Sequence, residues 1–239
     1  MPRRAQYSER SFGARAGAPG LACRADSVCE RYRERRSRGG DPMAHIAALA
    51  IEDVDPEIRD SLQAMEETGG YIPRGQLTMA RRPELVKAMS VMLAAVRSGT
   101  VERNLKSLVG LAVDIAARCP HTQSHAAFRA ASNGMPVEKL RAVYDFEESD
   151  LLSEREKAAL RLARDGSVVP NLVTEQHFEA LREWFDEGEI VELVAVISWR
   201  GFLNHWNNIM ATETHPLPAG FAREHLSAVG WEAGPHAAT

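Results

Sequence analysis

The chain has 239 residues, of which 44% are hydrophobic, and a net charge of −4 at neutral pH. This length and apolar content allow one or two domains with a sizeable core. No apolar run approaches the roughly 20 residues that span a bilayer, so we expect a soluble, cytoplasmic protein without a membrane partner.

The first 42 residues differ from the rest of the chain. They contain ten Arg, no Lys and five acidic residues, a net charge of +5, which leaves −9 for residues 43–239. Such a segment cannot bury enough apolar surface to offset its ordering entropy. We therefore expect a disordered basic tail at 1–42 and one helical domain at 43–239. Attachment to nucleic acid or membrane, a targeting peptide and translation from an upstream start all remain open for the tail. Translation from an upstream start is favoured, because Met43 begins a conventional amphipathic sequence. Arg without interleaved aromatics is weak support for nucleic acid.

From Pro56 onward, apolar residues recur at three- and four-residue spacing, which predicts a series of helices. The first two end at Gly69-Gly70 and near Gly99, and a capping box of Ser153 and Glu156 predicts the start of another. A helix is expected from near Thr174, followed by a turn at 186–189. The stretch 190–210 is apolar on nearly every side in its first half, which predicts a central buried helix. No second strand-like run exists to pair with it, so the predicted fold class is all-α.

A thiol and two imidazoles lie within seven residues at Cys119, His121 and His125. The apolar stripe from Leu105 to Ala116 predicts a helix that stops just before Cys119. Pro120 suits the first position of a new helix, because its missing N–H would have no partner there. Cys119 should then cap the N-terminus of a helix running to about residue 133, where backbone amides and the helix dipole favour a thiolate.

Two other interpretations of this cluster stay open. A lone cysteine is commonly a small buried hydrophobe, and the nearby histidines make the two possibilities about equal. His121 and His125 project from one helix face and could share a proton relay or a metal ion. Two histidines four apart without an acidic third ligand are weak support for a metal, so neither a metal nor a cofactor is expected.

The order of these features resembles the carboxymuconolactone decarboxylase and alkylhydroperoxidase-D family of small all-helical proteins. The resemblance covers about 83–210. The residues that carry the resemblance are 99–100, the helix at 105–109, the motif at 119–127, and the segments 134–140, 152–160 and 202–207. It implies an alkylhydroperoxidase-D-like multi-helix bundle.

The family motif has two cysteines two residues apart, a later histidine and a glutamate on the preceding helix. In this chain Cys119 matches the first cysteine of the motif and His125 matches the later histidine. Thr122 occupies the position of the second cysteine, and Ser107 occupies the position of the glutamate. No vicinal disulfide can form. The resemblance therefore implies a single-cysteine peroxidase or antioxidant enzyme, in which Cys119 becomes a sulfenic acid that an external thiol reduces.

Two alternatives follow from the same resemblance. The decarboxylase branch works without a cofactor, so His121 or His125 could move a proton on a small carbonyl or lactone substrate. Arg118 and Arg129 are possible carboxylate binders by proximity, although surface roles are commoner for Arg. The missing cysteine and glutamate also allow a non-catalytic family member.

Further along, the density of polar and aromatic groups at 199–207 could line a pocket. His205 and Trp206 are weak substrate-binding candidates, and a histidine bonded at a subunit interface is the competing interpretation of His205. Wide apolar helix faces favour a homo-oligomer. Cys23 and Cys29 lie in the tail, so no disulfide framework is indicated.

Overall fold

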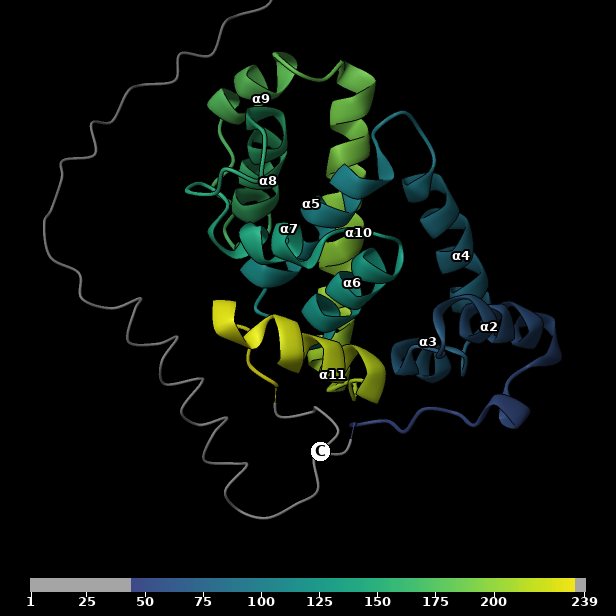
Figure 1. Ribbon diagram of the computed structural model, residues 1–239. Coiled ribbons are helices and arrows are strands. Elements are labelled where there is room, and N and C mark those ends of the chain that lie inside the picture. The colour runs from purple at the N-terminus through teal and green to yellow at the C-terminus, as the bar shows by residue number, and fades with distance from the viewer. Residues whose placement is uncertain (1–43, 235–239) are drawn as a thin grey trace, which may run out of the picture. The chain divides into compact units, whose positions relative to one another are not determined.

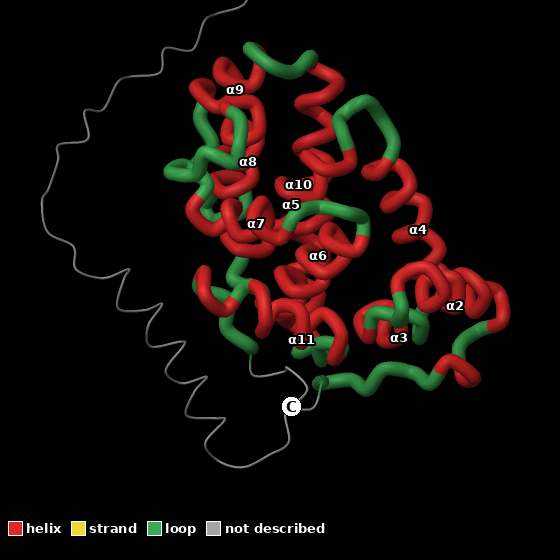
Figure 2. The backbone as a smooth tube through the Cα atoms, viewed as in Figure 1, coloured by secondary structure: helices red, strands yellow, loops and turns green. Residues whose placement is uncertain are grey.

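The structure, a computed structural model, describes residues 44–234, and the predicted tail at 1–42 lies outside the described residues. Within 44–234 the regular elements are helices and no β-strand occurs, as Figure 2 shows, so the predicted all-α fold is confirmed. None of the helices in this range is long and apolar enough to cross a membrane.

The elements carry the labels of Figure 1. The α-helices are α2 (Pro56–Gly69), α3 (Arg74–Met79), α4 (Pro83–Arg97), α5 (Arg103–Ala116), α6 (Pro120–Ser132), α7 (Val137–Ala142), α8 (Glu154–Gly166), α9 (Glu175–Arg182), α10 (Glu187–Met210) and α11 (Pro216–His225). Short 3-10 turns are η1 (Ile51–Asp53), η2 (Val143–Asp145) and η3 (Ser227–Val229).

Helix α5 is the centre of the fold and packs against α6, α8 and α10. Its predicted stripe is buried from Leu105 to Ala112, and Leu108 and Leu111 have no exposed surface. Figure 1 shows α8 and α9 on one side of α5 and α10, and α2, α3 and α4 on the other. Helix α11 packs along α6. Helices α5 and α10, which pack against each other, therefore separate two groups of outer helices.

The helix starts follow the capping chemistry of the sequence. The predicted capping box of Ser153 and Glu156 opens α8, and Thr174 is the N-cap of α9. The predicted turn at 186–189 is wrong: Asp186 caps α10 and forms a capping box with Glu189, so these residues begin a helix. Gly70 ends α2 with a φ of +77°, a left-handed conformation that glycine adopts without a steric penalty.

Helix α10 is one continuous helix of 24 residues, as the apolar run predicts. Its first half is not buried on every side, however. Leu193 is fully buried, whereas Val191 and Val194 are 66% and 39% exposed. The helix therefore buries one face in the core and presents another at the surface.

Candidate active site

A cavity of about 220 Å³ lies between the α2–α4 group and helices α6 and α10. Its wall combines apolar side chains such as Met79 and Leu203 with basic ones. Three arginines border it, Arg97, Arg129 and Arg200, and no Asp or Glu side chain of the described residues does. Arg97 and Arg129 thus bring positive charge to the cavity that no ion pair of the described residues offsets, which suits an anion.

Cys119 lies at the predicted helix boundary, but its sulfur is not the predicted thiolate. It is the N-cap of α6, and Pro120 is the first helical residue, so this boundary is confirmed. The thiol is 1% exposed and does not border the cavity. Burial raises the pKa of the Cys119 thiol, and a hydrogen bond with Thr122 and the charge of Arg200 only partly oppose that effect. The expected thiolate is therefore wrong, because the sulfur is covered by protein.

His121 and His125 come together as α6 geometry requires, and both border the cavity. Their rings stack with centroids 4.3 Å apart, and Nδ1 of His121 lies 3.2 Å from the hydroxyl of Thr214. Burial, with Arg200 nearby, lowers the pKa of His121 to about 3. Burial also lowers the pKa of His125 well below its ordinary value, helped by His121 and Arg129. Both rings are neutral at pH 7.

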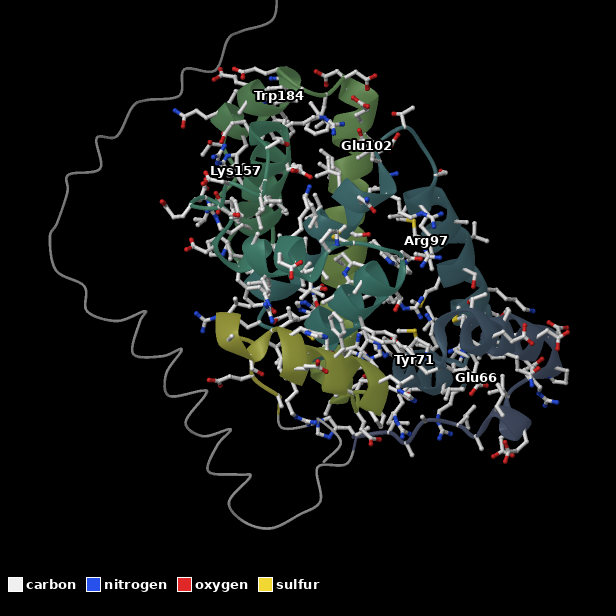
Figure 3. The ribbon with its side chains drawn as sticks, in the orientation of Figure 1. Glu66, Tyr71, Arg97, Glu102, Lys157 and Trp184 are labelled. Carbon is white, nitrogen blue, oxygen red and sulfur yellow. The ribbon has the colours of Figure 1, made fainter. Side chains whose placement is uncertain are left out.

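Tyr71 holds His125 from one side. Its hydroxyl lies 2.7 Å from Nδ1 of His125, and its own ring is 1% exposed and stacked on His215. Burial raises the pKa of Tyr71, so the phenol keeps its proton. Nε2 of His125 is buried and has no hydrogen-bond partner among the described residues. Figure 3 labels Tyr71, in the link between α2 and α3, and Arg97, at the end of α4.

A buried polar network behind the cavity was not predicted from the sequence. Asp114 of α5 has no exposed surface and binds Arg200 through both carboxylate oxygens, with Nε 3.0 Å from Oδ1. Asn204 donates to the same oxygen at 3.1 Å and accepts from the hydroxyl of Thr122. Burial raises the pKa of Asp114, while the Arg200 charge lowers it. The network fixes the Arg200 guanidinium at the cavity wall.

His205 and Trp206 are not brought together with the histidine pair. His205 is exposed and borders a second cavity of about 400 Å³, on another side of α10, with Asn204 and Asn208. Trp206 is half-buried beside Phe202 and borders neither cavity.

Two other sequence candidates take separate places. Ser107, at the family's glutamate position, donates its hydroxyl to the backbone of Arg103. Of the two arginine candidates, Arg129 borders the cavity and Arg118 is exposed. Over residues 44–234 no group of three His, Cys, Asp or Glu is placed to hold a metal ion.

Known proteins resemble this chain in sequence and in fold. The family model described as "Carboxymuconolactone decarboxylase family" matches residues 83–165, which hold α4 to α8 and the Cys119 motif. A curated relative, the uncharacterized protein YdfG of Bacillus subtilis (strain 168), is 27% identical over 128 residues, 53% of this chain and 85% of that protein.

Solved structures extend the likeness over most of the chain. The apo debrominase Bmp8 is 28% identical, with a TM-score of 0.70 over 75% of this chain and 97% of that one. A cysteine-to-alanine variant of Bmp8 in complex with 2,3,4-tribromopyrrole has a TM-score of 0.71 at 27% identity, over 80% of this chain and 100% of its own. A peroxidase-related protein of Ralstonia eutropha JMP134, described as an alkylhydroperoxidase AhpD core, shares the fold at 19% identity, with a TM-score of 0.65 over 75% of this chain and 96% of that one. Residues 83–165 thus match the carboxymuconolactone decarboxylase family, and the described helices share the alkylhydroperoxidase-D-like fold.

Proposed function

We propose that the chain is a cofactor-free enzyme that transfers a proton on a small organic acid held in the cavity of His121 and His125. The charge of the cavity supports an anionic substrate. Arg97 and Arg129 form no ion pair with a carboxylate of the described residues, and the proximity of Arg129 lowers the pKa of Arg97 in addition to the effect of burial. A bound carboxylate would relieve that repulsion between like charges.

The observation that carries the proposal is the state of His125. Its ring is neutral, Tyr71 occupies Nδ1, and Nε2 is left without a partner in a residue that borders the cavity. With the Tyr71 hydroxyl donating its hydrogen bond to Nδ1, the hydrogen of the neutral ring is on Nε2, which can donate it to a substrate. In a decarboxylation the carboxylate leaves as carbon dioxide, and the electron pair of the broken C–C bond takes the proton from Nε2. The Tyr71 hydroxyl proton passes to Nδ1 in the same step, so the ring stays neutral, and solvent then returns a proton to the Tyr71 phenolate.

A second candidate is thiol chemistry at Cys119. The likeness to a debrominase crystallised as a cysteine-to-alanine variant favours it, and so does Thr122, which borders the cavity and contacts Cys119. With a hydroperoxide, the sulfur attacks the outer oxygen and the O–O bond breaks. An alcohol leaves and Cys119 becomes a sulfenic acid. One external thiol then forms a mixed disulfide and water, and a second thiol releases Cys119. This route requires a local movement that uncovers the sulfur.

Two arms of one experiment separate the candidates. The first follows carbon dioxide release and carbon-bound deuterium by NMR, with small β-keto and lactone carboxylic acids in deuterated buffer. The second follows intact mass after treatment with hydrogen peroxide. Proton transfer predicts turnover that His125→Ala abolishes, whereas Cys119→Ser and the exposed control His45→Ala leave it nearly unchanged.

The opposite result would favour thiol chemistry over proton transfer: the intact mass shows oxygen added to Cys119, and Cys119→Ser loses turnover whereas His125→Ala keeps it. A chain inert in both arms would refute both candidates and leave a binding protein.

A further inference from the structure

Asn207 is a second buried polar group in the cavity whose bonding is incomplete. Its side chain is 8% exposed and borders the cavity, and its Oδ1 atom has no hydrogen-bond partner among the described residues. A buried acceptor left unpaired is costly, by an amount comparable to a lost hydrogen bond. Proton transfer by His125 makes no use of this oxygen. Asn207 therefore calls for its own explanation.

The orientation of the amide is fixed by its other end. Nδ2 of Asn207 donates to the backbone carbonyl of Leu203 at 2.8 Å. Because only the nitrogen can donate to a carbonyl oxygen, the amide cannot be turned over, and Oδ1 must be the end without a partner. The unpaired atom is thus an acceptor, and its complement in a ligand is a donor.

Gly75 of α3 leaves space next to this oxygen. It borders the same cavity, and a Cβ atom at position 75 would stand 3.0 Å from Oδ1 of Asn207, at the tight limit of contact. An alanine there would press against the acceptor. The absence of a side chain at Gly75 therefore avoids a tight contact with this buried oxygen.

We propose that Asn207 selects organic acids that carry a hydrogen-bond donor, a ring N–H or a hydroxyl, with Oδ1 accepting that hydrogen while the arginines hold the carboxylate. The proposal rests on the proposed function in one respect, that the cavity binds a small organic acid. Asn207 is then a specificity-determining residue: an acid of the same shape without the donor leaves Oδ1 unpaired and binds more weakly.

The test compares two acids of nearly equal shape and charge. Pyrrole-2-carboxylate has a ring N–H where furan-2-carboxylate has a ring oxygen. Their dissociation constants are measured by calorimetry or by NMR titration on the full chain, without any need for turnover. We expect the pyrrole acid to bind at least about fivefold more tightly, the effect of one hydrogen bond to a buried acceptor.

The variants locate the effect. Asn207→Ala removes the acceptor, and Gly75→Ala places a methyl group against it where the donor of the ligand would bind. Each variant should therefore reduce the ratio of the two dissociation constants to near one. The matched control is Asn208→Ala, which changes the next residue of α10, an exposed asparagine at the second cavity, and should keep the wild-type ratio.

Equal binding of the two acids to the wild type would overturn the selection by Asn207 and leave the proposed function intact. A preference that survives in both Asn207→Ala and Gly75→Ala would place the donor's partner elsewhere and also overturn it. If neither acid binds, or if Arg129→Ala leaves their binding unchanged, the basic cavity itself is not an acid site and the proposed function fails as well.

Discussion

Glu192 of α10 binds the residues at the start of α5, and its negative charge should contribute measurably to the free energy of unfolding. Its carboxylate accepts hydrogen bonds from the backbone N–H groups of Thr100 at 2.8 Å and Val101 at 3.0 Å, and it pairs with Lys106 at 2.9 Å. Burial alone would raise the pKa of this carboxyl. The Lys106 bond and the two backbone bonds outweigh it and lower the pKa to about 2, from an ordinary value of 4.5.

The expected magnitude follows from that shift. A difference of about 2.5 pKa units corresponds to about 3.4 kcal/mol of stability at neutral pH, at 1.36 kcal/mol per unit. The Glu192 side chain is 22% exposed, so solvent screening reduces this figure, and we expect Glu192→Gln to cost about 2 kcal/mol at pH 7. Because the folded-state pKa is the lower one, the stabilisation is fully present above pH 4.5. It is lost as the pH falls towards 2.

Urea unfolding followed by circular dichroism at pH 7, 4 and 3 measures the effect. The difference in unfolding free energy between wild type and Glu192→Gln should shrink steadily as the pH falls. Glu183→Gln, which removes an exposed carboxylate, is the control and should cost about 0.5 kcal/mol or less at every pH. A cost for Glu192→Gln that stays constant between pH 7 and 3 would refute the electrostatic account, and so would no cost at pH 7.

Three further predictions concern the site and the core. Because burial covers Cys119 and raises its pKa, its reaction with a disulfide reagent at pH 8, assigned by peptide mapping, should be at least about tenfold slower in the folded chain than in urea. Equal rates would show an open thiol. The ring of His121 should show no titration by NMR between pH 8 and 5, because its pKa is about 3, and the stability linked to its neutral form should fall only as the pH drops below 6.5 towards 3. A midpoint near 6.5 would contradict its burial. Leu108→Ala should cost about 2–5 kcal/mol in urea unfolding, against about 0.5 kcal/mol or less for the exposed Val191→Ala, and similar costs would refute the central position of α5.

The helices of this fold could be predicted because their signals are local. Pro120, the capping box at Ser153 and the glycine stop at Gly70 each act within one turn, so the sequence shows them directly. The exposure of Val191 was missed for the opposite reason. Whether an apolar residue is covered depends on which other helix packs on it, and spacing along one helix does not show that.

The site was predictable only where its residues are neighbours in sequence. His121 and His125 share a helix face, so their pairing follows from spacing. Tyr71 lies 54 residues from His125, and Asp114 lies 86 from Arg200. Neither contact leaves a pattern in the sequence. The state of Cys119 was missed similarly, because the N-cap position predicts a low pKa and only the surrounding packing shows that burial prevails.

Helix α10 serves both cavities from different sides of one cylinder. Arg200 and Asn207 face the basic cavity, and Gly201 and Asn208, each one position later, face the other. One residue along an α-helix is a rotation of about 100°. A single-residue deletion early in α10 would thus bring Gly201 and Asn208 to the basic cavity and put glycine in the place of the Asp114-bound guanidinium. Point substitutions can change the lining of one cavity without changing the other. Any change in the length of this helix would alter both linings at once.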